Sequence, residues 1–525
     1  MVLPLHVVGK KNMRCFATSF VSSSKMISLV YILIALLPMV ALIILNKHTG
    51  KNNPLPPGPR GLPIIGNLHQ LDNSKLTSQL WHFSKTYGPL FSLKIGNKQA
   101  IVVSSPKLAK VVLKDHDLDV CTRPPSIGPL KLTYNGLELI FSPYSEHWKE
   151  LRKICVVHLF SSKKISTFSH VRKSEVKKML EILSAHMANS KVTNLSEVLM
   201  AISSSIICRV AFGRKYDGEG AEKSRFHGLL SESQAMLLSF FVADFIPVLG
   251  WIDRAVGKVS RLEKTFLALD EFFQEVVDDH LDPHRVKQNE DDEDIVDVLL
   301  QLKKQGQLSI DLTNDQIKAV IMDILVAGTD TSAATAVWVM TGLMKNPRAM
   351  AKAQEEIRNH CGNEEFIEEE DVQKLEYLKA VIKEALRLYA PTPLIPREAI
   401  RGFTLEGYEI KPKTIVYVNG WAIQMDPEAW KDPEEFYPER FLNSEIDFRG
   451  QDFEFIPFGA GRRICPGISL GIATVELIIA NLLNSFNWEM PEGMKSEQID
   501  TDSLPGLARH KKNHLCLVAK KHFSV

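Results

Sequence analysis

The sequence predicts a mainly α-helical protein with a small β portion, preceded by one N-terminal transmembrane helix. Three observations support this prediction. From about Gly61 onward, apolar residues recur at helical spacing over most of the chain. Residues 89–105 and 403–418 instead alternate between apolar and polar positions and contain turn residues, as hairpins do. Residues 27–45 form a single uncharged apolar run.

The composition is that of an ordinary globular protein. The chain has 525 residues, of which 45% are hydrophobic and 24% charged, and this excludes a disordered, collagen-like or multi-span membrane protein. The net charge is +1, so no overall field attracts nucleic acid and none is expected as a partner. The seven cysteines are widely spaced, which favours a reducing compartment over a disulfide scaffold.

The run at 27–45 is 19 residues long, enough for a helix to cross a bilayer core of about 30 Å. Basic residues flank the run on both sides, but a chain that starts at Met26 has them only after it. Because basic residues next to a transmembrane helix stay on the cytosolic side, this count places the bulk of the protein in the cytosol. Residues 1–26 are therefore interpreted as an untypical extension containing a mis-assigned start. A transit peptide and a cleaved signal peptide are the alternatives. The proline-rich stretch 46–60 predicts a stiff hinge, and 61–525 a single catalytic domain.

The longest predicted helix begins near Thr313, which forms a capping-box pattern with Gln316, and ends near Lys345, before a proline. About 32 residues correspond to a length of about 48 Å. Its centre, AGTDTS at 327–332, contains glycine and polar residues, and an interior glycine alone costs about 1 kcal/mol. This pattern predicts a site in the middle of a buried helix. A glycine-mediated helix crossing is the structural alternative.

A second motif lies near the C-terminus, where FIPFGAGRRICPG occupies residues 455–467. Glycines allow a loop to approach a flat ligand closely, and Pro466 is predicted to open a helix. Cys465 then lies just before free backbone N–H groups at the positive end of the helix dipole, which favours its thiolate. Arg463 is placed to meet an anionic group. GAGRRI lacks the third glycine of a dinucleotide loop, so neither NAD nor flavin is expected.

FGAGRRICPG resembles the haem-thiolate loop of the cytochrome P450 family, FxxGxRxCxG. Four further segments match that family in order: WKELRK at 148–153, AGTDTS at 327–332, KEALRL at 383–388 and PERF at 438–441. With the apolar run and the prolines, the resemblance covers the chain from Met26 to its end. It implies the cytochrome P450 fold, with the long central helix lying over the haem. The motifs are similar to those of the membrane-anchored plant A-type subgroup of specialised metabolism, and the tail GLARHKKNHLCLVA is similar to that of aldoxime-metabolising members.

The resemblance also implies roles for individual residues. Cys465 would be the axial ligand of the iron of haem b, because a cysteine thiolate ligates haem in this family. Thr331 would hydrogen-bond the bound oxygen, and Asp330 would relay protons. Further contacts to the haem would come from Trp148, Arg152, Arg397, Phe458 and Arg463, and a structural charge network from Glu384, Arg387 and Arg440. Trp148 and Arg152 can point the same way because they lie four residues apart on a helix, for which Ser142 is the expected N-cap and Pro143 the first turn.

A hydrophobic or aromatic small molecule is expected as substrate, because the segments that would contact it are mostly apolar. The residues assigned to this pocket are Ile324, Ala327, Leu394, Ile395, Gly506 and Leu507. Electrons would come from NADPH through a separate membrane-bound NADPH–cytochrome P450 reductase. The docking face for that reductase would include Lys149, Lys153 and Arg462.

The sequence thus predicts a monooxygenase dependent on NADPH and O2, anchored in the endoplasmic reticulum by one helix, with its catalytic domain in the cytosol. Its substrate would belong to plant specialised metabolism, such as an aldoxime, a phenolic or flavonoid, or a terpenoid. Two alternatives stay open at this point. One is a haem-thiolate isomerase or dehydratase, and the other is a non-catalytic haem- or ligand-binding membrane protein.

Overall fold

The computed structural model describes residues 55–216, 221–285, 293–306, 308–362 and 364–522. The chain divides into two units, Met1–Leu55 and Pro56–Val525, and the helices and strands of the described residues lie in the second. The predicted extension 1–26, the transmembrane helix 27–45 and residues 46–54 of the hinge lie outside the described residues. The end of the hinge lies along the first strand, where Ser92 donates its backbone N–H to the carbonyl of Pro57 (2.8 Å) and its hydroxyl to that of Pro56 (2.8 Å).

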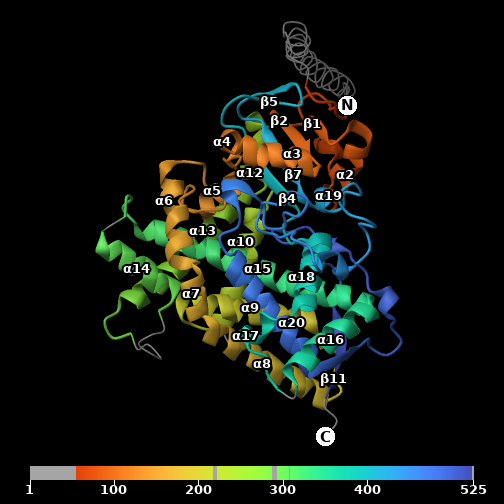
Figure 1. The fold of residues 1–525 in the computed structure, drawn as a ribbon. Helices are drawn as coiled ribbons and strands as arrows, with labels where there is room; N and C mark the ends of the chain where they lie inside the picture. The colour runs from red at the N-terminus through yellow and green to blue at the C-terminus, as the bar shows by residue number, and fades with distance from the viewer. Residues whose placement is uncertain (1–54, 217–220, 286–292, 307, 363, 523–525) are drawn as a thin grey trace, which may run out of the picture. The chain divides into compact units, whose positions relative to one another are not determined.

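Most of this unit is helical, as predicted (Figure 1). The long helix α15 forms its centre and packs against α9, α18 and α20. The helices are α2 (Leu76–Tyr87), α3 (Pro106–Lys110), α4 (Asp117–Val120), α5 (Ile127–Leu132), α6 (Glu146–Ile154), α7 (Ser162–Thr167), α8 (Ser169–Ala188), α9 (Leu195–Phe212), α10 (Ala221–Leu237), α11 (Val242–Phe245), α12 (Trp251–Ala255), α13 (Lys258–Leu281), α14 (Ile295–Gln305), α15 (Asn314–Lys345), α16 (Pro347–Cys361), α17 (Glu369–Val372), α18 (Glu376–Tyr389), α19 (Gly420–Gln424) and α20 (Ile468–Ser485).

The strands form one four-stranded sheet and three smaller groups. The larger sheet has the order β1-β2-β7-β4, in which β2 and β7 are parallel and the other two pairings are antiparallel. Both predicted hairpin segments contain strands, although β7 leaves the second one to join the larger sheet. The strands are β1 (Leu90–Ile95), β2 (Lys98–Val103), β3 (Thr193–Asn194), β4 (Leu394–Glu398), β5 (Phe403–Leu405), β6 (Tyr408–Ile410), β7 (Ile415–Asn419), β8 (Phe486–Glu489), β9 (Ser503–Leu504), β10 (His510–Lys511) and β11 (Cys516–Lys521).

Three described helices, α9, α15 and α20, are long and apolar enough to cross a membrane. Each of them is nevertheless a core helix, because 67%, 83% and 67% of their apolar windows are buried inside the protein. Helix α15 begins as predicted: the Thr313 hydroxyl accepts the backbone N–H of Gln316, and the Gln316 side chain accepts that of Thr313. The apolar pattern of α15 is therefore that of a buried helix.

Two predicted helix starts are wrong. Helix α6 begins at Glu146, and its N-cap is Ser145, whose hydroxyl accepts the Trp148 N–H (3.1 Å). Ser142 lies before the helix, and its carbonyl accepts a hydrogen bond from Arg463. Helix α20 begins at Ile468 with Gly467 as N-cap, two residues after the predicted start at Pro466.

Candidate active site

The loop before α20 holds Cys465 in a half-buried position. Gly461 has a φ of 71°, and a Cβ at this position would lie 2.4 Å from the carbonyl oxygen of Leu113, so only glycine fits. The backbone N–H of Cys465 donates to the carbonyl of Phe458 (3.1 Å), and the Gly467 N–H hydrogen-bonds the sulfur. Burial raises the pKa of the Cys465 thiol, while the Gly467 N–H and nearby Arg152 lower it. A metal cation at the sulfur would supply the charge that a buried thiolate needs.

Four arginines from separate segments lie near this loop with few anions among them. Burial lowers the pKa of all four, and repulsion from a second arginine adds to the effect in three of them. The pKa of Arg463 falls to about 9 and that of Arg397 to about 10. The Arg397 Nε is buried without a hydrogen-bond partner among the described residues. A group with two carboxylates, such as haem with its propionates, fits the cluster formed by Arg123, Arg152, Arg397 and Arg463.

Trp148 and Arg463 contact each other in this cluster. The guanidinium of Arg463 lies over the indole ring, 4.5 Å from its centroid. Both side chains also donate to the carbonyl of Leu139, from the Trp148 Nε1 at 3.0 Å and from Arg463 at 3.3 Å. Trp148 therefore holds Arg463, and its N–H is directed at the protein rather than at the cluster's centre.

Arg123 belongs to the cluster but is missed by the sequence analysis. Its Nε donates to the Ile140 carbonyl (2.9 Å), and its terminal nitrogen contacts the Pro396 carbonyl. Arg123 is a single arginine before two prolines and is part of no motif with a recognisable spacing. Its place in the cluster is therefore visible only in the folded structure.

Helix α15 is partly exposed near its middle, although the rest of the helix is buried in the core. From Gln316 to Met344 every residue is buried except Ala327, Gly328 and Thr331. Ala327 and Thr331 lie four residues apart on one face, and the Thr331 hydroxyl donates to the Ala327 carbonyl (2.7 Å). We interpret this partly exposed face, which has buried turns on both sides, as the wall of an internal cavity.

The glycine of this segment also makes a helix crossing, the structural alternative considered above. A Cβ at Gly328 would lie 2.6 Å from Cδ1 of Ile207 on α9, so a larger residue would push the helices apart. From the same helix α9, the Ser203 hydroxyl donates to the Thr329 carbonyl (2.8 Å). Both interpretations of AGTDTS therefore apply, the ligand site and the helix crossing. The contact between α9 and α15 fixes the position of α15 next to the cavity.

Asp330 is buried and has two partners from distant parts of the chain. Gln234 on α10 donates its amide to the carboxylate at 2.7 Å, and the His510 Nε2 on β10 lies 3.5 Å from it. The His510 side chain is 28% exposed, so it connects the buried carboxylate with solvent. Neither contact is foreseen from the sequence, because Gln234 lies outside the quoted motifs and the tail that contains His510 gives no indication that this histidine reaches Asp330.

Glu384, Arg387 and Arg440 come together in one buried network. The Glu384 carboxylate accepts from the Arg387 Nε (2.9 Å) and a terminal nitrogen (2.8 Å), and from the Arg440 Nε (3.1 Å). The first two side chains are fully buried. Arg387 further donates to the carbonyls of Gln424, Pro433 and Glu435. The network therefore joins α18 to the segment that leads to the cysteine loop.

The residues assigned to the substrate pocket are only partly brought together. Ala327 faces the cavity, and Ile324 is buried one turn earlier on α15. Strand alternation places Ile395 on the β4 face that carries Arg397, whereas Leu394 lies on the opposite face and packs with α2 and β1. Gly506 is exposed, and Leu507 packs at the edge of the core. Phe458, which is predicted to contact the haem, makes an edge-on contact with Phe448, with 5.4 Å between the ring centroids.

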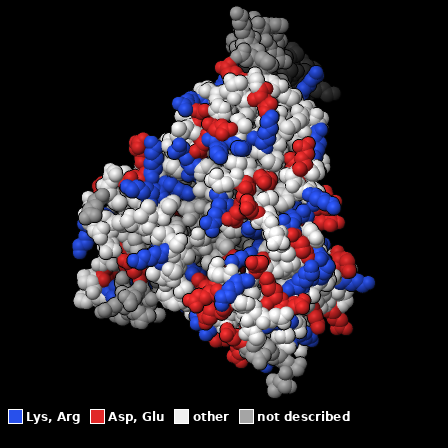
Figure 2. Space-filling view, in the orientation of Figure 1, with Lys and Arg blue, Asp and Glu red and all other residues white. Residues whose placement is uncertain are grey.

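The predicted basic docking face is balanced by acidic neighbours. Figure 2 shows basic and acidic side chains mixed over the visible surface. Each of the three expected docking residues has a carboxylate partner: Lys149 with Glu146 (2.6 Å), Lys153 with Glu150 (3.3 Å), and Arg462 with Asp117 (3.0 Å).

A half-buried cysteine just before a helix, a cluster of four arginines and the partly exposed face of α15 together fit a haem-thiolate site. The family model described as Cytochrome P450 matches residues 56–518. The chain therefore belongs to the cytochrome P450 family, as its motifs predict, and is a haem-thiolate monooxygenase. The family uses haem b and receives electrons from a redox partner.

Relatives match over nearly the whole chain. A 6,7,8-trihydroxycoumarin synthase of Pastinaca sativa is 46% identical, covering 93% of this chain and 98% of that protein. A 5-OH-xanthotoxin synthase of the same plant is 47% identical, with coverages of 94% and 99%. Cytochrome P450 71B34 of Arabidopsis thaliana is 45% identical, with coverages of 94% and 99%.

A solved structure of a zebra fish cytochrome P450 with abiraterone superposes with a TM-score of 0.70 at 26% identity. The match covers 85% of this chain and 100% of that one. It confirms the predicted cytochrome P450 fold for the helical unit. The predicted N-terminal helix lies outside the residues that the structure describes.

Proposed function

We propose that this chain is an NADPH- and O2-dependent monooxygenase that oxidises an aromatic small molecule in plant specialised metabolism. A ring of the coumarin type is the first choice of substrate. The cavity face of α15 carries the proposal, because Ala327 and Thr331 form an apolar wall with one hydroxyl, as an apolar substrate requires. The names of the two Pastinaca sativa relatives, a trihydroxycoumarin synthase and a 5-OH-xanthotoxin synthase, support the choice of ring.

Bound haem supplies the activation of O2 and the transfer of one oxygen atom to the substrate. The protein's own contribution is to hold the sulfur of Cys465, to bind the propionates with the arginine cluster and to move protons. Asp330 takes a proton that enters through His510, and Thr331 holds one at the cavity surface. The Thr331 hydroxyl must turn away from the Ala327 carbonyl to do this, which a rotation about χ1 achieves.

The test is a product screen in microsomes that contain the chain and a plant reductase. Coumarins and furanocoumarins would be supplied beside aldoximes, flavonoids and terpenoids, and labelled O2 would mark any inserted oxygen. We expect a coumarin product that contains one labelled oxygen and forms only with NADPH, and no product from the Cys465→Ala variant. Turnover of non-aromatic substrates alone would refute the aromatic assignment. A product that forms without NADPH and O2 would favour the isomerase or dehydratase alternative.

We further propose that the chain is anchored in the endoplasmic reticulum with its catalytic domain in the cytosol. The apolar run at 27–45 supports this, as do the exposed apolar side chains of Val248, Trp251 and Val256, which are 78%, 63% and 62% accessible. An NADPH–cytochrome P450 reductase in the same membrane would be the electron donor. Carbonate extraction and protease protection of microsomes test the arrangement, and a lumenal catalytic domain would contradict it.

A further inference from the structure

Two buried carboxyl groups meet where the α5–α6 loop (residues 133–145) touches the central helix. Glu138 in the loop is fully buried, and Asp323 on α15 is 9% exposed. Their carboxyl groups hydrogen-bond to each other, which requires one shared proton, because two carboxylates offer only acceptors. Asp323 precedes Ala327 by one helical turn, so the contact lies next to the cavity wall.

The surrounding hydrogen bonds decide which carboxyl group carries the proton. Glu138 accepts the backbone N–H groups of Ile140 and Phe141, the latter at 2.9 Å from both carboxylate oxygens. These donors stabilise a carboxylate. Asp323 accepts the backbone N–H of Leu139 (2.7 Å) and shares that of Ile140 with Glu138. Burial raises the pKa of both groups, and the neighbouring Glu138 raises that of Asp323 further.

The charged neighbours lead to the same assignment. Glu138 faces Arg123 and Arg463, which favour its ionised form. The titratable neighbour of Asp323 on the other side is the buried thiol of Cys155, at the end of α6, which brings no positive charge. The proton therefore belongs on Asp323.

We propose that Asp323, in its protonated form, donates a hydrogen bond to the Glu138 carboxylate, and that this pair positions the arginine cluster that binds the haem propionates. The link runs through the two residues after Glu138. Leu139 donates its N–H to Asp323 and accepts from Trp148 and Arg463. Ile140 donates to Glu138 and accepts from Arg123. Asp323 and Glu138 are positioning residues, since neither reaches the reacting atoms.

The experiment exploits the difference between the two members of the pair. Asp323→Asn keeps one acceptor for the Leu139 N–H and one donor for Glu138, so the variant reproduces the protonated acid. Glu138→Gln turns an amide N–H2 toward backbone N–H donors and removes the charge beside the arginines. Asp323→Leu removes the pair. Asp311→Asn, an exposed position just before α15, controls for the loss of one carboxylate.

Haem loss from the full-length holoprotein to excess apomyoglobin would be measured for each variant. We expect the wild-type rate for Asp323→Asn and about tenfold faster loss for Glu138→Gln, equivalent to about 1.4 kcal/mol. Asp323→Leu should also lose haem faster. The proposal is wrong if Asp323→Asn loses haem as fast as Asp323→Leu, or if Glu138→Gln behaves like the wild type.

A pH series of melting temperatures gives a second readout that does not depend on activity. A carboxyl group whose pKa is raised in the folded state contributes stability at low pH that is lost as the pH rises. Asparagine does not titrate. The melting temperature of Asp323→Asn relative to wild type should therefore increase from about pH 4 to about pH 8. A constant difference for Asp323→Asn would show that Asp323 is ionised.

Discussion

Replacing Glu384 by glutamine should destabilise the protein strongly although the two side chains have the same shape. One Glu384 oxygen accepts from Arg387, Arg440 and the backbone N–H of Tyr437, and the other accepts from the Arg387 Nε. A glutamine oxygen can keep the first three bonds, but each is weaker by about 1 kcal/mol because the acceptor has lost its charge. Its amide N–H2 meets the Arg387 Nε–H, so the fourth bond is lost, at a cost of about 2 kcal/mol.

The total cost is about 5 kcal/mol, at the upper end of the roughly 3 to 5 kcal/mol that removing one partner of a buried ion pair costs. The unfolding entropy of a folded unit of about 470 residues (Pro56–Val525) is about 1 kcal/mol per degree. The melting temperature should therefore fall by about 5 °C.

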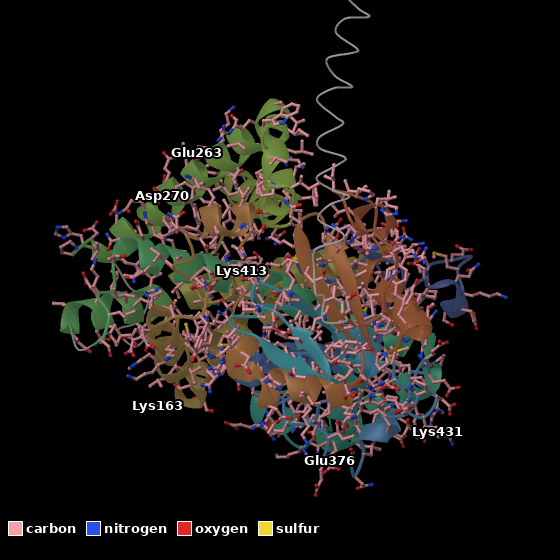
Figure 3. All side chains as sticks on the ribbon, turned by 90° about the horizontal axis from the view of Figure 1, so that it is seen from above. Lys163, Glu263, Asp270, Glu376, Lys413 and Lys431 are labelled. Carbon is pink, nitrogen blue, oxygen red and sulfur yellow. The ribbon has the colours of Figure 1, made fainter. Side chains whose placement is uncertain are left out.

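The assay is a thermal melt of the full-length holoprotein. Glu376→Gln on the same helix α18 is the matched control, because Glu376 is exposed and lies at the outside of the fold (Figure 3). That variant should change the melting temperature by less than about 1 °C, since surface carboxylates contribute little. Equal shifts for Glu384→Gln and Glu376→Gln would refute the argument from burial.

Four further predictions concern the cysteine, the central helix and the N-terminus. Cys465→Ala should lose the red-shifted Soret band of the reduced CO complex, and an intact thiolate spectrum would remove Cys465 as the ligand. Because burial raises the pKa of the Cys465 thiol and haem binding requires the thiolate, haem uptake by the apoprotein should increase from about pH 6 to about pH 9; a flat profile would contradict this. Thr331→Ala should retain haem but release more peroxide per NADPH consumed, and unchanged coupling would argue against a role in proton transfer. Deleting residues 2–25 should preserve microsomal location and activity, whereas loss of correct targeting would favour the transit peptide.

The parts of the structure that depend on local sequence could be predicted. The start of α15 follows from Thr313 and Gln316, whose capping bonds span three residues. Helix α6 shows how a local prediction fails. Ser142 and Ser145 are both plausible caps by residue type, but Ser145 is the cap, while the Ser142 carbonyl accepts a hydrogen bond from Arg463 in a distant segment.

Contacts between distant segments could not be predicted. The cysteine loop indicates that an anion-binding arginine lies nearby, but Arg123 reaches the site only because the carbonyls of Ile140 and Pro396 hold it. The partners of Asp330 likewise come from α10 and β10. Glu138 and Asp323 lie outside the motifs quoted above, and their pairing becomes visible only when the α5–α6 loop is placed on α15.

The larger sheet has a consequence for biosynthesis. Strand β2 ends at Val103, but its parallel partner β7 begins only at Ile415. At about 5 to 20 residues per second, a ribosome needs roughly 15 to 60 s to make the chain between them. During this interval the edge of β2 that β7 will cover has no partner, and an unpaired apolar edge invites pairing with other chains. Chaperones that bind the nascent chain should therefore be needed most before residue 415 emerges, and chains truncated before that residue should aggregate.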